Sequence, residues 1–459
     1  MIIVLSFLSG CIAFLGFAPI SIWPAPFIAL FILNRILENR RIVSRLIISQ
    51  VFGLGLLLPN QIWTGTYVGN LPWITLAVIQ SFLFWPFAIR ITGRIKVNAW
   101  LFAFESVIVE LLLRTIPFTG FGWSRLSFTQ VNSPLSSIYP ILGSAGVIFF
   151  IALIAANRRF LKFIFLLSFI LLANNLPSTL NTSDTVKIAL VQGGVKNLGL
   201  DFNATPREVF NSHLNITTQK LKANQVDLII WPENSVDIDL FKFTDVQESL
   251  SDLSKSLNTP ILVGGITNSY GDLRNISVLF NPQIANVYTK RYLTPFGEYI
   301  PMRSFVENFT NLTQEVEDFH AGNQSNLVSI NGASTQIFIC YELLNDLFKN
   351  EVNSDFLIVQ TNNATFGDTA QLDQELKIAQ VRAIESGREV AYVSTTGVTS
   401  FISSDGSIKV SLPKFQASVL IESIETKSGQ NLNQKLTIFP EVFSIFMVFL
   451  LLFRNRRFM

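Results

Sequence analysis

Eight stretches of mostly apolar residues constrain the fold of this chain more than any other feature of its sequence. A helix needs about 20 apolar residues to cross the hydrocarbon core of a bilayer. The high mean hydropathy (+0.42), the low share of charged residues (14%) and the 41 Phe suit a chain with much of its length in lipid. The candidate spans lie at approximately 2–18, 20–36, 46–64, 72–90, 98–114, 134–156, 160–177 and 436–453. The sequence therefore predicts a membrane domain over residues 1–180, with about seven transmembrane helices, and a C-terminal transmembrane helix at 436–453.

Basic residues follow every second apolar segment, which predicts how the helices are oriented. Lys and Arg concentrate on the cytoplasmic side of membrane proteins, so these four ends are predicted to face the cytoplasm. The polar block at 184–428 follows the seventh segment and is therefore predicted to lie on the opposite side. The basic residues that carry this inference are Arg40, Arg41 and Arg45, then Arg90, Arg94 and Lys96, then Arg158, Arg159 and Lys162, and finally Arg454, Arg456 and Arg457.

Composition also narrows the classes of function. The chain has only two His and two Cys, so no metal site of the usual His and Cys spacing can be assembled from it. A magnesium or calcium site made of carboxylates alone stays open. The polar block shows no basic face of the kind that binds nucleic acid. We predict no metal, no cofactor and no nucleic-acid partner.

The polar block alternates short β-branched runs with helical patterns, which predicts an α/β layered domain. A run around 400–403 next to Asp405-Gly406 suggests a hairpin, so the predicted sheet is mixed. The predicted strands are 186–191, 226–231, 260–263, 285–289, 335–340, 356–360 and 389–394, and the predicted helices are 207–223 and 371–386.

Cys340 is the most informative polar-block residue, because it is the single thiol there and directly follows a predicted strand. A free cysteine is most often a small buried hydrophobic residue, and Cys340 alone favours that reading. A cysteine on a sharp turn after a strand is, however, also placed as a nucleophile, with the next backbone N–H, that of Tyr341, available to an oxyanion. The other cysteine, Cys11, lies in the first apolar segment.

Two further strand-end motifs supply the groups that a thiol nucleophile needs. Glu233 in Trp231-Pro232-Glu233 is placed as a general base, although a capping role is equally compatible with its position. Lys290 ends another strand and opens a Pro- and Gly-rich turn that contains Glu298, where an ammonium can stabilise an oxyanion; a solvated Lys is the commoner case. Base, oxyanion stabiliser and nucleophile together form a set for acyl transfer.

Three charged or titratable side chains outside these motifs have less defined roles. Glu110 and Arg114 form an i,i+4 pair on one predicted helix, which leaves a helical ion pair and a functional carboxylate as alternatives for Glu110. Glu105 has no basic residue four positions later and is predicted to face the interior of the bundle. His213 and His320 are predicted to be surface or packing residues.

The three motifs resemble those of the carbon–nitrogen hydrolase (nitrilase) superfamily, which uses Glu, Lys and Cys on an αββα sandwich. The tract from Lys290 to Pro301 and the motif Cys340-Tyr341-Glu342 occur here in a chain that also has many apolar segments. This combination resembles one branch of the superfamily, the apolipoprotein N-acyltransferase family. The resemblance implies that Glu233 is the base, Lys290 the oxyanion stabiliser and Cys340 the nucleophile. It also implies that Glu298, Tyr341 and Glu342 support the site.

The resemblance further implies an activity and a location. Members transfer an acyl chain from a membrane phospholipid, through a cysteine thioester, to the N-terminal amine of the diacylglyceryl-cysteine of apolipoproteins. They lie in the bacterial inner membrane with the catalytic domain on the periplasmic side. Two alternatives remain open at this point: a membrane-tethered amidase or nitrilase-like hydrolase that uses water as acceptor, and a non-enzymatic lipid-binding protein.

The chain departs from the family pattern at three places. The family usually carries a Trp shortly after the Gln-Gly of the first strand, and none follows Gln192-Gly193 here. Thr365 stands where the family has the Trp of Trp-Phe-Gly. A His often seen in the family before the helix that contains Arg382-Ala383-Ile384-Glu385-Ser386-Gly387-Arg388 is absent, and Asp373 and Glu375 lie near its place. These differences bear on the loops that contact the substrate and not on the three central residues.

Overall fold

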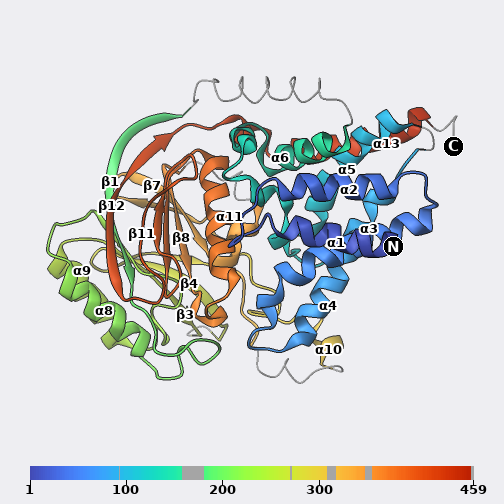
Figure 1. Ribbon diagram of the computed structural model, residues 1–459. Coiled ribbons are helices and arrows are strands. Elements are labelled where there is room, and N and C mark those ends of the chain that lie inside the picture. The colour runs from blue at the N-terminus through green and yellow to red at the C-terminus, as the bar shows by residue number, and fades with distance from the viewer. Residues whose placement is uncertain (92–93, 158–179, 269–270, 308–316, 347–353, 456–459) are drawn as a thin grey trace. The chain divides into compact units, whose positions relative to one another are not determined.

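The computed structural model describes residues 1–91, 94–157, 180–268, 271–307, 317–346 and 354–455 (Figure 1). The chain divides into two compact units, one formed by Met1–Ser178 with Asn431–Met459 and the other by Thr179–Gln430. The predicted seventh segment, 160–177, and the basic residues at 158, 159, 162, 456 and 457 lie outside the described residues.

The first unit is helical, and its helices follow the apolar segments of the sequence. Its α-helices are α1 (Ile2–Phe14), α2 (Ala25–Leu37), α3 (Ile42–Asn60), α4 (Asn70–Ser81), α5 (Ile95–Thr115), α6 (Tyr139–Ala156), α12 (Leu432–Leu436) and α13 (Phe439–Asn455). Short 3-10 helices extend or join them: η1 (Ile62–Gly65), η2 (Phe82–Ala88), η3 (Gly122–Ser124), η4 (Leu126–Gln130) and η5 (Pro134–Ile138).

Within the described part of the chain, three helices are long and apolar enough to cross a membrane: Ile42–Asn60, Asn70–Ala88 and Pro134–Ala156. The first two apolar helices have 13 residues each and are shorter than predicted. A helix of 13 residues is only about 20 Å long. The connection between α1 and α2 contains Pro19 and Pro24, and Pro cannot continue a helix from its interior. These prolines explain why α1 ends before residue 18 and α2 begins after residue 20.

Glycines let α1 and α3 approach closely. A Cβ atom on Gly10 would collide with the carbonyl oxygen of Phe52, and one on Gly55 would collide with that of Phe7. Small residues at helix contacts replace the hydrophobic driving force that is missing in lipid, because they bring the two backbones within van der Waals distance.

The buried charges of the helical unit are paired, but not as the i,i+4 spacing predicts. Glu110 accepts hydrogen bonds from Arg125 Nε (3.2 Å) and from the backbone N–H and hydroxyl of Ser127 (2.8 and 2.7 Å). Arg114 instead pairs with Glu441 of α13 at 2.9 Å. A helical ion pair with Arg114 was one of two alternatives for Glu110, and each of these side chains instead has a counter-charge on another segment.

Glu105 faces the interior of the helical unit, as expected. Its side chain is fully buried, and its Oε2 lies 2.5 Å from Arg90 Nη1. The Arg90 guanidinium also stacks on the ring of Phe102, with Cζ 5.1 Å from the ring centroid. This carboxylate thus neutralises one of the arginines that mark a basic helix end.

The second unit is built on two sheets, each of six strands within the described residues. The first has the order β12-β1-β2-β3-β4-β5 and the second β11-β10-β9-β8-β7-β6. The strands of the first are β1 (Asn181–Gln192), β2 (Leu228–Ile230), β3 (Ile261–Thr267), β4 (Arg274–Phe280), β5 (Ile284–Thr289) and β12 (Ser418–Ser428). Those of the second are β6 (Leu327–Ile330), β7 (Ala333–Ile339), β8 (Phe356–Thr361), β9 (Val390–Ser394), β10 (Ser400–Ile402) and β11 (Ile408–Ser411).

Both sheets are mixed, as predicted. The segments β1, β2 and β3 pair in parallel, as do β7, β8 and β9, and the outer strands pair antiparallel. Three longer helices accompany the sheets: α8 (Glu208–Lys220), α9 (Thr244–Leu257) and α11 (Ala370–Ser386). The sequence patterns did not predict α9, β4, β6, β12 or the short helix α10 (Arg303–Val306), and they gave no bounds for β11. The predicted elements lie within a few residues of their observed bounds, apart from β1 and β3, each of which extends further at one end.

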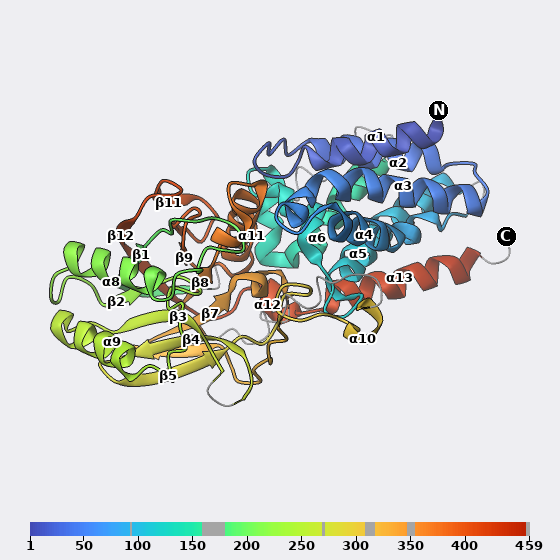
Figure 2. The same ribbon diagram turned by 90° about the horizontal axis from the view of Figure 1, so that it is seen from below.

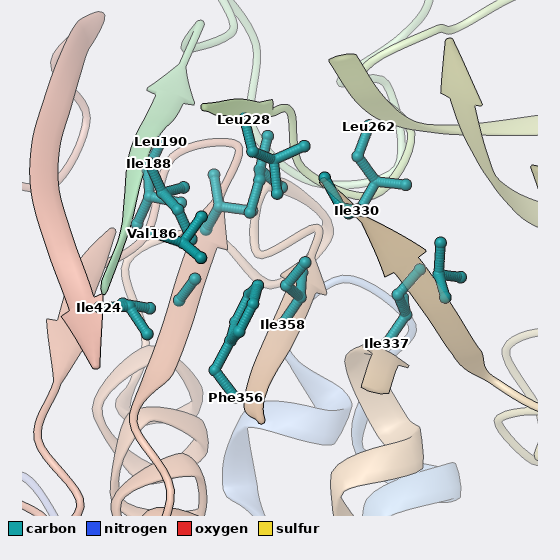
Figure 3. Packing of buried hydrophobic residues seen from close by; sticks show 14 of the residues in the cluster. Val186, Ile188, Leu190, Leu228, Leu262, Ile330, Ile337, Phe356, Ile358 and Ile424 are labelled. Carbon is teal, nitrogen blue, oxygen red and sulfur yellow. The ribbon is translucent and has the colours of Figure 1, made fainter. Parts of the chain in front are cut away.

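One apolar core lies between the two sheets (Figure 3). Alternate residues of β1, Val186, Ile188 and Leu190, enter this core from the first sheet. Ile337 and Ile339 of β7 and other residues enter it from the second. This period of two is the geometry of a strand, whose successive side chains point to opposite faces.

The remaining residues of β1 point the other way, into a second core. Ala189 and Val191 pack there with Phe210 of α8 and with Leu250 of α9. These two helices cover the outer face of the first sheet, and α11 covers that of the second (Figures 1 and 2). The four layers, helix–sheet–sheet–helix, confirm the predicted αββα sandwich.

Candidate active site

The three predicted site residues follow the last residues of three strands. Glu233 comes three residues after β2, Lys290 directly after β5 and Cys340 directly after β7. Glu233 and Lys290 meet, with Lys290 Nζ 3.4 Å from Glu233 Oε1. The backbone N–H of Asn362, just after β8 of the other sheet, donates to Glu233 Oε2 at 2.9 Å. The ends of strands from both sheets therefore converge on one buried polar cluster.

Lys290 is almost fully buried, with an exposed fraction of 1%. Its Nζ lies 2.9 Å from Glu298 Oε2 and 3.4 Å from Glu233 Oε1. Burial by itself lowers the pKa of this ammonium, but the carboxylates of Glu298 and Glu233 outweigh burial and raise the pKa above its ordinary value. Lys290 is therefore a fixed cation at working pH, which suits an oxyanion stabiliser and not a proton donor.

Asn275 holds the two carboxylates on either side of Lys290. Its Nδ2 donates to Glu233 Oε1 at 2.7 Å and to Glu298 Oε1 at 2.8 Å. The second oxygen of Glu298 accepts from the backbone N–H of Thr294 at 2.8 Å, which anchors this side chain in the Pro- and Gly-rich turn. Gly264 of β3 leaves room for the other carboxylate, since a Cβ there would lie 2.6 Å from Glu233 Cα.

Cys340 occupies a turn that non-glycine residues rarely adopt. Its φ is +48°, and the chain passes there from β7 into the 3-10 helix η7 (Cys340–Leu344). A side chain in this region costs about 1 kcal/mol or more, and such strain is retained where the surrounding structure holds it. The predicted sharp strand-to-helix turn is confirmed.

Burial raises the pKa of the Cys340 thiol well above its usual range, and the carboxylates of Glu375 and Glu233 raise it further. The Lys290 ammonium and a hydrogen bond with Thr361 act in the opposite direction. The side chain is only partly shielded from solvent, and both cysteines of the chain are free. The raised pKa favours the neutral thiol, so a nucleophilic role for Cys340 requires a base that removes its proton.

Glu342 ties the turn after Cys340 to the turn after Lys290. Its Oε1 accepts from the Tyr288 hydroxyl at 2.7 Å and from the Arg291 N–H at 2.8 Å, and its Oε2 from the Ile339 N–H at 2.9 Å. The side chain is fully buried, and burial raises its pKa to about 7. Tyr341 beside it is also buried. Through these contacts Glu342 fixes the turn that contains Cys340.

The raised pKa of Glu342 predicts how stability depends on pH. A carboxyl group whose folded pKa exceeds its unfolded value of about 4.3 stabilises the fold fully below that unfolded value, and this contribution is lost as the pH rises through about 7. The loss amounts to roughly 3 kcal/mol. We expect the melting temperature of the detergent-solubilised protein to fall between pH 5 and pH 8, and to fall less in Glu342→Gln. A variant with the same pH dependence as the wild type would contradict this.

Two comparisons with known sequences now identify the family. The family model described as carbon–nitrogen hydrolase matches residues 187–434. The chain belongs to the carbon–nitrogen hydrolase family. A second model, described as the apolipoprotein N-acyltransferase N-terminal domain, matches residues 9–157. The resemblance inferred from the motifs is confirmed by both matches.

Two relatives of this carbon–nitrogen hydrolase match it over most of its length. A protein named apolipoprotein N-acyltransferase from Mycolicibacterium smegmatis is 28% identical over 91% of this chain and 79% of its own. A protein of the same name from Wigglesworthia glossinidia brevipalpis is 26% identical over 97% of this chain and 96% of its own length. A solved carbon–nitrogen hydrolase superfamily structure from Xanthomonas campestris is 18% identical over 53% of this chain and 91% of its own, with a TM-score of 0.40. Together with the long apolar helices of the described residues, these matches indicate a membrane protein.

Sequence reasoning missed the amides that hold the site of this carbon–nitrogen hydrolase together. Asn275 bridges two carboxylates, and Gln360 links the sheets by donating to the Trp231 carbonyl at 2.6 Å and accepting from the Ser277 hydroxyl at 2.6 Å. Each amide lies at the end of an apolar strand run, Asn275 before Ile276 in β4 and Gln360 after Val359 in β8. A polar residue at such a place, where its burial requires hydrogen-bond partners, is the signal that could have found them. His213 is buried, and its ring accepts from the Gly193 N–H at 3.1 Å, so it is a packing residue as predicted.

Proposed function

We propose that this protein is an apolipoprotein N-acyltransferase with Glu233, Lys290 and Cys340 as its catalytic residues. The observation that carries the proposal is the buried contact of Lys290 with Glu233, at the strand ends that also hold Cys340. This cluster lies in a chain whose residues 9–157 match the N-terminal domain of that family. The names of its full-length relatives supply the acceptor, an apolipoprotein.

In the first half-reaction, the acyl donor is a membrane phospholipid. Glu233 takes the proton from Cys340, and the sulfur attacks the ester carbonyl carbon. The Lys290 ammonium stabilises the resulting oxyanion, and the backbone N–H of Tyr341 is the second proposed donor. When the intermediate collapses, the C–O bond of the ester breaks, the leaving oxygen takes the proton from Glu233, and a lysophospholipid departs. The acyl chain is left as a thioester on Cys340.

In the second half-reaction, the acceptor is the neutral α-amino group of a diacylglyceryl-cysteine at the N-terminus of an apolipoprotein. The amine nitrogen attacks the thioester carbonyl, and Lys290 again stabilises the oxyanion. Glu233 receives a proton from the nitrogen and returns it to the departing sulfur. The C–S bond breaks, an amide forms and the free thiol is restored. Glu298 and Glu342 keep Lys290 and the thiol turn in place throughout.

We infer that the protein lies in the bacterial inner membrane with the catalytic unit on the periplasmic side. The basic ends of alternate apolar segments support this orientation. Both proposed substrates are anchored in a bilayer. Membrane helices of the enzyme would therefore hold its active site close to the bilayer surface where both substrates lie. A thiol outside the cytoplasm is exposed to oxidation, and a single cysteine in the catalytic unit avoids an internal disulfide.

The experiment that tests the proposal is a mass measurement of the peptide containing Cys340 after the purified protein is incubated with phospholipid vesicles. We expect this peptide to gain the mass of one acyl chain, and to lose it when a synthetic diacylglyceryl-cysteine peptide is added. The acceptor peptide should gain the same mass. Rapid release of free fatty acid without acceptor would instead identify a hydrolase. No adduct on Cys340, with unaltered phospholipid, would point to a lipid-binding protein.

A further inference from the structure

The two oxygens of the proposed base, Glu233, are bound differently. Oε1 accepts from Asn275 Nδ2 at 2.7 Å and lies 3.4 Å from Lys290 Nζ, whereas Oε2 accepts from the backbone N–H of Asn362 at 2.9 Å. Each carboxylate oxygen offers about two lone pairs. Among the described contacts, Oε1 therefore has both lone pairs in use and Oε2 keeps one. Oε2 is the oxygen that can take the proton of a thiol, and the Asn362 N–H sets its direction.

Asn362 lies in the loop that follows β8, and a single carboxyl group holds the residues on both sides of it. Thr361 Oγ1 donates to Glu375 Oε1 at 2.9 Å, and Asn363 Nδ2 donates to Glu375 Oε2 at 2.6 Å. Glu375 belongs to α11, and its exposed fraction is 1%. Because the two hydrogen bonds hold the chain just before and just after Asn362, they restrict the direction of its peptide N–H.

The side chain of Asn363 is held on both of its polar atoms. Its Nδ2 also donates to Gln371 Oε1 at 2.9 Å, and its Oδ1 accepts from the Ser394 hydroxyl at 2.5 Å. Gln371 Nε2 in turn donates to Glu375 Oε2 at 3.0 Å. The space beside Asn363 is filled, since a Cβ on Gly397 would collide with Asn363 Oδ1. A buried network whose groups are satisfied is rigid, so the loop after β8 has little freedom to move.

We propose that Glu375 is a positioning residue, which holds the loop after β8 so that Oε2 of Glu233 faces the Cys340 thiol. This inference rests on the proposed function, in which Glu233 takes the thiol proton. The role requires an oxygen that accepts hydrogen bonds and not a negative charge. Burial raises the pKa of Glu375. A neutral carboxyl group still serves, because one of its oxygens can donate to the Thr361 hydroxyl while the other accepts from the amide.

The test is the burst of p-nitrophenol released when the full-length protein in detergent reacts with p-nitrophenyl butyrate. The ester transfers its butyryl group to the Cys340 sulfur, and the thiol proton leaves with p-nitrophenol, so one molecule is released per reactive thiol. The burst amplitude counts folded, reactive protein, and the first-order rate constant at saturating ester reports how well the base acts. Cys340→Ala supplies the background. A variant that unfolds in part loses amplitude, whereas a misdirected base lowers the rate constant.

Three variants address the hold on the loop. Glu375→Leu removes both acceptors, and we expect the rate constant to fall by about tenfold or more while the amplitude is kept, because a small misplacement of a catalytic group costs at least that much. Asn363→Ala breaks the same hold from the other side; it should have the same effect, and it serves if Glu375→Leu does not fold. Glu375→Gln should keep the wild-type rate constant, since its amide oxygen can replace Oε2 and its N–H can donate to the Thr361 hydroxyl.

The matched control for lost stability is Leu250→Ala. Leu250 is fully buried in the core between α9 and the first sheet, so its truncation destabilises the same unit without touching the loop after β8. Its rate constant should equal that of the wild type. The proposal is overturned if Glu375→Leu and Asn363→Ala keep the wild-type rate constant, if Leu250→Ala lowers it as much, or if Glu375→Gln is as slow as Glu375→Leu. A wild-type protein without a burst above Cys340→Ala would overturn the proposed function itself, so the two failures are distinguishable.

Discussion

Replacing Cys340 by Ala is expected to abolish lipoprotein N-acylation, with a loss of at least about a thousandfold, as when the nucleophile of other acyl-transfer sites is removed. Without the sulfur no thioester can form, and neither Glu233 nor Lys290 can substitute for it. The fold should survive, because Ala is smaller than Cys and the thiol is only partly buried at the surface of the inter-sheet core. The measurement is acyl transfer to a diacylglyceryl-cysteine peptide, paired with a melting curve.

The matched control is Cys11→Ala, which removes the other free cysteine of the chain. Cys11 lies in α1, in the helical unit, and this variant should retain wild-type activity. If the folded Cys340→Ala variant kept more than a small fraction of the wild-type activity, the assignment of Cys340 as the nucleophile would be wrong. If both variants were inactive, the loss could not be assigned to the nucleophile.

Replacing Lys290 by Met is expected to damage both activity and stability. The ammonium is buried between Glu298 (2.9 Å) and Glu233 (3.4 Å), so its removal leaves two buried carboxylates without their cation. Breaking a buried ion pair from one side costs about 3–5 kcal/mol. Loss of one oxyanion donor costs a further factor of about 10²–10³ in the rate of acyl transfer. Rates should be measured below the melting temperature of the variant, so that the two effects are separated.

A second substitution separates the structural effect from the chemical one. In Lys290→Met/Glu298→Gln one of the unpaired charges is also removed, so stability should recover in part while the rate stays low. Lys409→Met is the control for the loss of a lysine, because Lys409 pairs with Glu389 at 2.6 Å but its side chain is 28% exposed. It should cost less than Lys290→Met, because Lys409 is partly exposed and the backbone N–H of Glu425 still donates to the Glu389 carboxylate at 2.9 Å. Recovery of the rate in the double variant would refute the proposed role of Lys290.

Strands and helices of the second unit, Thr179–Gln430, were predictable where a local sequence pattern determines them. The inward side chains of β1 alternate with a period of two, and the thiol follows directly on β7, so the strands and the thiol turn could be placed from the residues alone. The motifs that contain Glu233, Lys290 and Cys340 sufficed to predict the family and the αββα sandwich. The helix α9 was missed although its buried residues Val246, Leu250, Leu253 and Leu257 follow a helical spacing.

Partners that lie far apart in the sequence were not predictable. Glu110 and Arg114 have the spacing of a helical ion pair, yet Glu110 binds Arg125 and Arg114 binds Glu441, which is 327 residues away. Asn275 reaches Glu233 across 42 residues. A carboxylate interacts with whichever donor the packing brings within about 3 Å, and sequence spacing contains no information on that packing.

The sequence by itself therefore determined the apolar segments, the layered α/β unit, the three strand-end motifs and the family to which they belong. Each of these depends on local periodicity or on a short run of residues. Only the tertiary structure decided that Lys290 lies between two carboxylates and that Asn275 bridges them. The reason is physical: the ends of β2, β5, β7 and β8 converge only after two sheets have packed face to face, and the charge that surrounds the thiol is set by that convergence.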